Sequence, residues 1–279
     1  MDIFSDSKQI NLKLKDLSSK KKSIGFVPTM GALHEGHISL IKEAKNSSDI
    51  VIVSIFVNPK QFDRKGDLDS YPKQLDEDSK ILESLNIDYL FVPKVEDIYK
   101  KEFYTKVLVT NLTNKLCGSS RTGHFDGVAL IVTKLFNIIR PDIAFFGLKD
   151  YQQYYVIKKL SEDLNFNIDV RGVETVREKS GLALSSRNTN LSVRQREVIA
   201  PLLFEELVHL KDLVNDNQDI RASLDTIKNS LLQHGFSKID YLEILNNDLS
   251  PYQGNPDKGR IFAAVFLDKV RLIDNIALV

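Results

Sequence analysis

The sequence predicts an α/β protein in which a mainly parallel sheet is followed by a smaller α+β part. Over the first 176 of the 279 residues, short runs rich in β-branched and aromatic residues alternate with helical patterns. This alternation is typical of βα units around a parallel sheet. After residue 190 the order changes to two helical stretches and then three strand-like runs. With 42% hydrophobic and 27% charged residues, the chain is long enough for one large or two modest buried cores.

The first part is predicted to contain five strands and four helices. The expected strands are Ser23–Val27, Ile50–Val57, Asp88–Val92, Ile143–Phe146 and Asn167–Val170. Apolar residues at three- and four-residue spacing predict helices between them, over Gly36–Asn46, Lys73–Leu85, Phe125–Ile139 and Tyr151–Leu164. The result is a doubly wound, Rossmann-like parallel sheet. Because ligands of such sheets bind beyond the carboxyl ends of the strands, we expect Pro28–His37, Asn58–Gln61 and Gly147–Asp150 to converge on one crevice.

The second part is predicted to be α+β. Two amphipathic stretches, Val193–Leu213 and Ile220–His234, precede strand-like runs over Ile239–Leu245, Ile261–Leu267 and Val270–Ile273. We place the domain boundary near residue 176, which gives a Rossmann-like domain over residues 1–176 and a smaller C-terminal domain over residues 177–279.

Composition excludes several classes of partner. Lys plus Arg and Asp plus Glu each total 38, so the formal charge is zero and no global field favours nucleic acid or an anionic membrane. The single cysteine, Cys117, cannot form an internal disulfide, and the polar stretch Met1–Lys22 lacks the apolar core of a secretion signal. Apolar runs such as Ile50–Val57 are far shorter than the ~20 residues needed to cross a bilayer. We therefore expect a cytoplasmic protein.

The loop from Pro28 to His37 is the strongest candidate for a site. It follows a predicted strand and begins a predicted helix, so backbone amides and the positive end of the helix dipole are suited to a phosphate group. Gly31 and Gly36 allow close approach of a bulky anion, and His34 and His37 can both hydrogen-bond a triphosphate. A nearby polyanion favours protonated imidazoles and the helix end disfavours them, and the sequence leaves that balance open. A zinc site is the weaker alternative because no third ligand of suitable spacing lies nearby.

Other segments are ambiguous when taken alone. Asn58–Gln61 ends a strand, where Gln61 offers both a donor and an acceptor to a hydroxy acid. Gly147–Asp150 opens a helix and could bind nucleotide oxygens through its amides and Lys149, or it could be a solvated turn with an Asp cap. Ser185-Ser186-Arg187 by itself is typical of a surface turn.

Taken together, these motifs resemble a known family. His34-Glu35-Gly36-His37 is similar to the signature of the nucleotidylyltransferase superfamily, shared with class I aminoacyl-tRNA synthetases, and alone implies only AMP transfer. The longer strings resemble the pantothenate synthetases, also called pantoate–β-alanine ligases, in order along essentially the whole chain. The matching segments are Gly25–His37, Ser54–Phe62, Ser120–Phe125, Phe146–Gln153, Gly181–Asn188 and Arg271–Asn275.

The resemblance implies an ATP-dependent ligase that converts (R)-pantoate to pantoyl adenylate and then joins it to β-alanine, releasing AMP and pyrophosphate. It implies pantoate binding by Gln61 and Gln153, with Gln61 also meeting β-alanine. It implies ATP binding by a larger set, of which His34, His37, Lys149, Ser185, Ser186 and Arg187 are the expected catalytic residues. The full ATP-binding set is Pro28, Thr29, Met30, Gly31, His34, Gly36, His37, Gly147, Leu148, Lys149, Asp150, Val176, Leu184, Ser185, Ser186 and Arg187.

The resemblance also implies a homodimer. The position of Ser185-Ser186-Arg187 just beyond the domain boundary suggests that the C-terminal domain closes as a lid over ATP. Magnesium is expected to bind mainly through the ATP phosphates. Glu77 and Asp78 could reach that magnesium through water but are not assigned to it. The family commonly has other residues at Cys117, Thr122 and Ser180, none of which carries an assigned catalytic role. Two alternatives remain open, another nucleotidylyltransferase that does not need Gln61 and Gln153, and a non-catalytic ATP-binding regulator. A class I synthetase is disfavoured because no basic anticodon-binding region is evident.

Overall fold

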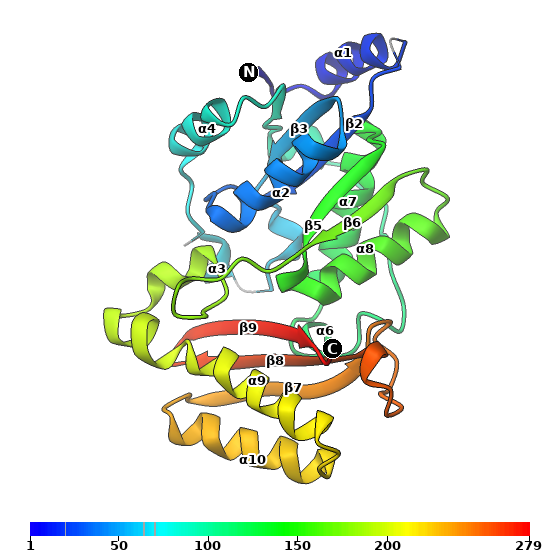
Figure 1. Ribbon diagram of the computed structural model, residues 1–279. Helices are drawn as coiled ribbons and strands as arrows, with labels where there is room; N and C mark the ends of the chain where they lie inside the picture. The colour runs from blue at the N-terminus through cyan, green and yellow to red at the C-terminus, as the bar shows by residue number, and fades with distance from the viewer. Residues whose placement is uncertain (20, 64, 70) are drawn as a thin grey trace. The chain divides into compact units, whose positions relative to one another are not determined.

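The computed structural model describes residues 1–19, 21–63, 65–69 and 71–279 (Figure 1). The chain forms two compact units. The first comprises Met1–Leu148 and Gln153–Glu174, and the second comprises Lys149–Gln152 and Thr175–Val279. Each unit has its own hydrophobic core.

A six-stranded parallel sheet forms the centre of the first unit, in the order β1-β4-β3-β2-β5-β6. The predicted α/β class is thereby confirmed. Its strands are β1 (Asp2–Phe4), β2 (Ile24–Thr29), β3 (Ile50–Ile55), β4 (Tyr89–Phe91), β5 (Ile143–Gly147) and β6 (Asp169–Val173). Its helices are α1 (Ser7–Ser19), α2 (Glu35–Ser47), α3 (Lys65–Asp69), α4 (Leu75–Ser84), α5 (Val95–Ile98), α6 (Cys117–Ser120), α7 (His124–Ile139) and α8 (Tyr151–Asp163). The first two residues of α8 belong to the second unit. The sequence patterns did not predict β1, which has three residues, or α1.

The strand order reverses at β2. Gly25 of β2 pairs with Val51 of β3 on one side and with Ile143 of β5 on the other, and all three strands are parallel. The connections that leave β2 and β5 therefore run in opposite directions across the sheet, and the carboxyl ends of these two strands are where ligands of such sheets bind. The loop that carries His34 and His37 begins there.

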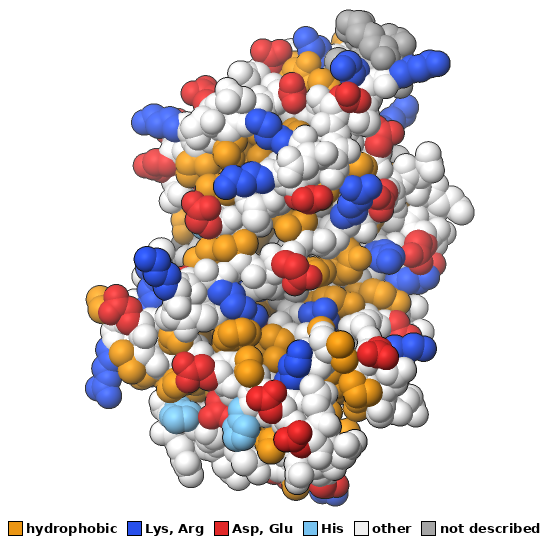
Figure 2. Space-filling view, viewed as in Figure 1, with side chains coloured by type: hydrophobic (Ala, Val, Ile, Leu, Met, Phe, Trp, Pro, Cys, Tyr) orange, Lys and Arg blue, Asp and Glu red, His pale blue; other side chains and the backbone are white. Residues whose placement is uncertain are grey.

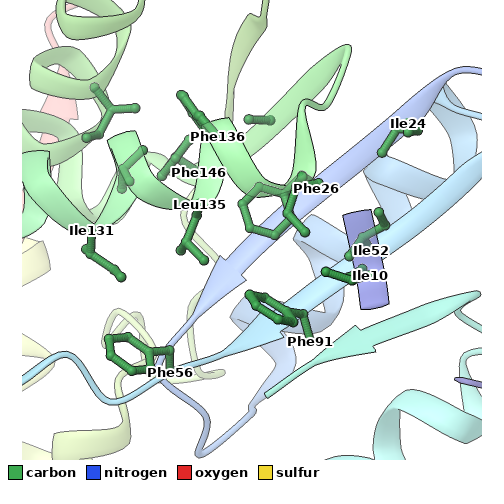
Figure 3. Packing of buried hydrophobic residues seen from close by; sticks show 14 of the residues in the cluster. Ile10, Ile24, Phe26, Ile52, Phe56, Phe91, Ile131, Leu135, Phe136 and Phe146 are labelled. Carbon is green, nitrogen blue, oxygen red and sulfur yellow. The ribbon is translucent and has the colours of Figure 1, made fainter. Parts of the chain in front are cut away.

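Apolar side chains cover both faces of this sheet. On one face, Phe26 and Ile52 pack with Ile131, Leu135 and Phe136 of α7 (Figure 3). These three α7 residues recur at helical spacing, and the helix is buried over most of its surface, with Asp126 and Asn137 among its exposed positions. On the other face, Leu40, Ile41 and Ala44 of α2 join Val27 and Val53 in a second cluster. Helices on both faces are what a doubly wound sheet requires.

The second unit contains a three-stranded antiparallel sheet, in the order β7-β8-β9, and two long helices. The elements are α9 (Leu202–Asn215), α10 (Ile220–Gln233), β7 (Lys238–Asn246), β8 (Gly259–Leu267) and β9 (Val270–Ala277). Leu207 and Leu210 of α9 and Ile227 and Leu231 of α10 share a core with the sheet. The predicted α+β character is confirmed.

The first helix of this unit differs from the single helix expected over Val193–Leu213. It consists of a π-helical turn, Gln195–Ile199, followed by α9. Pro201 has no N–H to donate, and at the preceding residue the Ala200 N–H bonds to the Gln195 carbonyl, five residues back. The apolar spacing continues through this change, so periodicity alone could not show it.

The surface is mixed in charge. On the face seen in Figure 2, Lys and Arg side chains are interspersed with Asp and Glu, in keeping with the formal charge of zero. Within the ranges that the structure describes, we find no helix with the length and apolar composition needed to cross a bilayer.

Candidate active site

The loop after β2 turns sharply before α2 begins. The Thr29 hydroxyl donates to the Ser54 carbonyl oxygen over 2.8 Å and accepts the Gly31 N–H at 3.1 Å. Gly31 and Ala32 both have positive φ, 81° and 52°. Glycine adopts this conformation without strain, but alanine does not, so something must hold Ala32 in place.

Asp78 supplies that support from α4. Its Oδ2 accepts the Ala32 N–H at 2.9 Å and its Oδ1 accepts the Leu33 N–H at 2.8 Å. The residue is 1% exposed. A carboxylate that accepts two backbone N–H groups away from water makes strong, charge-assisted hydrogen bonds. Asp78 therefore fixes the left-handed turn from which His34 projects.

Replacing Asp78 with asparagine is expected to weaken, about tenfold, the ATP-dependent step that the family resemblance implies. An amide can accept only one of the two N–H groups and turns its own NH₂ toward the other, and an unsatisfied buried donor costs roughly 1–3 kcal/mol. The effect should be measured as kcat/KM for ATP. Asp76→Asn, an exposed carboxylate on the same helix, is the matched control, and equal rates for the two variants would contradict this role for Asp78.

His34 and His37 cap the first turn of α2. His34 Nδ1 accepts the Gly36 N–H at 3.1 Å, and His37 Nδ1 accepts the His34 N–H at 3.3 Å. The ring centroids are 4.2 Å apart. Because each Nδ1 is an acceptor, the hydrogen-bond network assigns each ring as a neutral imidazole with its hydrogen on Nε2. The positive end of the helix favours the same neutral form, in which the Nε2–H group of each ring can donate a hydrogen bond.

Gly36 is required by the position of the His34 ring. A Cβ on Gly36 would lie 2.9 Å from His34 Cε1 and 3.0 Å from His34 Nδ1. The glycine thus makes room for the capping imidazole, in addition to any space it leaves for a ligand.

Gln61 lies in a short 3₁₀ helix, Pro59–Gln61, after β3. It is 9% exposed, and its Nε2 lies 3.2 Å from Met30 Sδ in the loop after β2. Its backbone carbonyl oxygen lies 2.7 Å from Nδ1 of His124, the first residue of α7. Two of the three predicted strand-end segments therefore meet in the first unit.

The third segment, Gly147–Asp150, spans the limit between the two units. Gly147 ends β5 and Leu148 follows it in the first unit, whereas Lys149 and Asp150 belong to the second. Gln153 is half-buried in the first turn of α8.

In the second unit, a hairpin-like loop carries the remaining candidates. The Leu184 N–H donates to the Val176 carbonyl oxygen at 3.0 Å, and Gly181 makes the turn with φ of 94°. Ser185 then caps a 3₁₀ helix, Ser186–Asn190, by accepting the Arg187 N–H at 3.3 Å. Thus Ser186 and Arg187 belong to an ordered helical turn and not to an irregular loop.

Asn188 anchors this turn. It is 2% exposed, and its Nδ2 donates to the Ala183 carbonyl oxygen at 3.1 Å. Asn188 and Ser185 line one pocket of the second unit together with Lys149 and Asp274. The structure thereby brings together two predicted ATP-binding side chains, Lys149 and Ser185, that are 36 positions apart in the sequence.

Two residues of β9 make hydrogen bonds that support the lining of this pocket. Asn275 Nδ2 donates to the Lys149 carbonyl oxygen at 3.0 Å. Asp274 accepts two hydrogen bonds from Arg177, from Nη1 at 2.5 Å and from Nη2 at 2.8 Å, and the guanidinium stacks 3.8 Å from the Phe204 ring centroid. Asp274 and Asn275 thus support the pocket, although neither belongs to the predicted ATP-binding set.

Comparison with known proteins identifies the family. The family model for pantoate–β-alanine ligase matches residues 2–277. The chain belongs to this family. It is 46% identical over 267 residues to the pantothenate synthetase of Caldicellulosiruptor bescii, covering 94% of this chain and 93% of that protein. It is also 46% identical over 268 residues to the pantothenate synthetase of Acinetobacter baylyi, covering 96% and 95%.

Solved pantoate–β-alanine ligases share the fold. The structure of pantothenate synthetase from Thermus thermophilus superposes with a TM-score of 0.93 at 37% identity, covering 100% of this chain and 99% of that one. The Francisella tularensis ligase, complexed with β-γ ATP and β-alanine, superposes with a TM-score of 0.81 at 40% identity, covering 100% and 98%. The resemblance drawn from the sequence motifs is confirmed, and the protein is a ligase of this family.

Proposed function

We propose that this ligase joins (R)-pantoate to β-alanine in two steps, through pantoyl adenylate, with release of pyrophosphate and then AMP. The observation that carries the proposal is the loop after β2, where Asp78 fixes a left-handed turn and the Nδ1 atoms of both histidines accept backbone N–H groups at the start of α2. Such an arrangement suits a nucleotide phosphate, and it occurs in a chain of the pantoate–β-alanine ligase family.

In the first step, a pantoate carboxylate oxygen attacks the α-phosphorus of ATP, and the bond to the pyrophosphate oxygen breaks. A carboxylate is already deprotonated at neutral pH, so this step requires positioning and stabilisation of developing charge more than a general base. We propose that His34 and His37 stabilise that developing charge by donating hydrogen bonds from their Nε2–H groups. Ammonium, hydroxyl and guanidinium groups all donate hydrogen bonds to phosphate oxygens. We therefore propose that the polyphosphate is bound by Lys149, Ser185, Ser186 and Arg187.

Substrate positioning is assigned to the remaining predicted residues. Gln61 and Gln153 hold pantoate, and Gln61 also meets β-alanine. The rest of the nucleotide site consists of Pro28, Thr29, Met30, Gly31, Gly36, Gly147, Leu148, Asp150, Val176 and Leu184. Of the Val176 backbone groups, the carbonyl oxygen already accepts from Leu184, so its N–H is the better candidate for contact with adenine.

In the second step, the β-alanine amine attacks the acyl carbon of the adenylate and the bond to AMP breaks. Exclusion of water protects the mixed anhydride until then, and residues 177–279 are proposed as the lid. A cytoplasmic homodimer is proposed on the family resemblance.

Magnesium is proposed to bind mainly through ATP phosphate oxygens, since Mg²⁺ keeps several waters and takes few protein ligands. Asp78 is poorly suited as a ligand because both of its oxygens already accept backbone N–H groups. Within the described ranges, no three His, Cys, Asp or Glu side chains are grouped so as to hold a metal ion. The metal would neutralise phosphate charge when bound.

Product analysis tests the proposed reaction. With ATP, pantoate and β-alanine present, we expect AMP to appear in equal amount to pantothenate, and omission of either acid should abolish AMP release in the steady state. Formation of ADP would rule out adenylation, because it would show transfer of the γ-phosphoryl group instead.

A further inference from the structure

Asn58 follows β3 and has a fully satisfied side-chain amide. It is 1% exposed. Its Nδ2 donates to Gln61 Oε1 at 2.9 Å and to the Gly127 carbonyl oxygen at 3.0 Å. Its Oδ1 accepts the Tyr99 hydroxyl at 2.8 Å and the Lys60 N–H at 3.3 Å. Two donors and two acceptor positions are all that an amide has, so Asn58 has no hydrogen-bonding capacity left for a substrate.

Two backbone groups determine which way round this amide lies. The Lys60 N–H can only donate, and the Gly127 carbonyl oxygen can only accept. A flipped Asn58 amide would face donor with donor at Lys60 and acceptor with acceptor at Gly127. The close packing of α7 maintains this arrangement, because a Cβ on Gly127 would lie 2.2 Å from the Lys60 carbonyl oxygen.

The Tyr99 hydroxyl also favours this orientation of the Asn58 amide, because it donates to Asn58 Oδ1. Burial raises the pKa of its hydroxyl, so the group remains a neutral O–H donor to Asn58 Oδ1 across the physiological pH range. Its ring lies 6.2 Å from that of Phe56, centroid to centroid, and the Lys60 ammonium lies 5.1 Å from its centroid. These contacts keep the hydroxyl in place.

The orientation of the Asn58 amide determines the orientation of the Gln61 amide. Because Asn58 Nδ2 needs an acceptor, the Gln61 amide turns its Oε1 toward Asn58 and its Nε2 toward Met30 Sδ, a weak acceptor at 3.2 Å. The backbone of Gln61 is held as well, since its carbonyl oxygen contacts His124 Nδ1 at 2.7 Å. The Gln61 amide therefore points its Nε2 toward Met30, and one of the two acceptor positions of its Oε1 is occupied by Asn58.

We propose that Asn58 is a positioning residue that fixes the Gln61 amide, so that its Nε2 end, and not its Oε1 end, faces pantoate. The substrate atom that Gln61 meets is accordingly an oxygen acting as an acceptor, from the carboxylate or a hydroxyl group. This inference rests on the proposed role of Gln61 in pantoate binding. It differs from the expectation that Gln61 uses both ends of its amide.

A double-mutant cycle tests this indirect role. In Asn58→Asp the new oxygen accepts where Nδ2 donated, so Gln61 turns its Nε2 away from the substrate, and we expect KM for pantoate to rise at least tenfold with KM for ATP unchanged. In a Gln61→Ala background, Asn58→Asp should change KM for pantoate by less than about twofold, because residues that act through one another are non-additive. Equal losses in both backgrounds would overturn the proposal by showing that Asn58 contacts pantoate directly.

A second variant covers the case in which Asn58→Asp fails to fold because its carboxylate faces the Gly127 carbonyl oxygen. Gln61→Glu keeps an acceptor for Asn58 but loses the donor when ionised, whereas a neutral carboxyl group regains an O–H. Since glutamate normally titrates near pH ~4.3, the ratio of pantoate KM values, variant over parent, should fall as pH is lowered from 8 to 5. A ratio that stays constant or rises would overturn the proposal. An inactive parent enzyme would instead contradict the proposed function itself.

Discussion

Replacing His37 with alanine is expected to slow formation of the adenylate by about 10²–10³-fold, the range associated with loss of one transition-state donor. In the structure, His37 Nδ1 accepts the His34 N–H, which leaves the hydrogen of the neutral ring on Nε2. Negative charge grows on the α-phosphate oxygens as pantoate attacks, so this hydrogen bond is stronger in the transition state than in the ground state. The loss should therefore appear in the rate constant more than in the affinity for ATP.

Single-turnover formation of pantoyl adenylate, measured with excess enzyme and without β-alanine, is the direct assay. The matched control is His209→Ala, since His209 lies in α9 with its side chain 56% exposed, and this variant should match the parent. An unchanged adenylation rate in His37→Ala would remove His37 from the chemistry.

Replacing Asp274 with alanine is expected to lower the free energy of unfolding by about 3 kcal/mol, at the lower end of the range for breaking a buried ion pair. The Asp274 side chain is 2% exposed and that of Arg177 is 17% exposed. The substitution leaves the Arg177 guanidinium against the Phe204 ring with two N–H groups that have lost their acceptor. We place the effect at the lower end because Arg177 keeps some access to water.

Urea unfolding of the full chain measures this change. Asp169→Ala is the matched control, because Asp169 also pairs with an arginine, Arg171, at 2.6 Å, but with side chains 55% and 42% exposed. Exposed pairs of this kind contribute about 0–1 kcal/mol. Equal shifts for the two variants would contradict the account of Asp274 as a buried anchor.

The sequence predicted those parts of the fold and the site that depend on local pattern. The strand–loop–helix around His34 and His37 was predictable because a β-branched run, two glycines and an amphipathic stretch follow each other directly. The helical break before α9 was not, because Pro201 lies within an uninterrupted apolar spacing. The three residues of β1 are too few to show a period.

The contacts that organise the site could not be predicted in this way because they join distant positions. Asp78 lies 46 residues from Ala32, and Asn58 lies 69 residues from Gly127. Neither contact leaves a periodic signal, although Asn58 belongs to a motif that resembles the family and the sequence makes Asp78 a possible indirect magnesium contact. The segment Arg271–Asn275 resembles the family, but the sequence alone offers no physical reason for its residues. The structure supplies one for Asp274, which pairs with Arg177, and for Asn275, which bonds to the Lys149 carbonyl oxygen.

Isotope exchange shows whether this chain activates pantoate by adenylation. Labelled pyrophosphate should exchange into ATP when pantoate is present and β-alanine is absent, because the first step is reversible and needs only these substrates. No exchange is expected without pantoate. Absence of pantoate-dependent exchange, in an enzyme that binds ATP, would contradict the account.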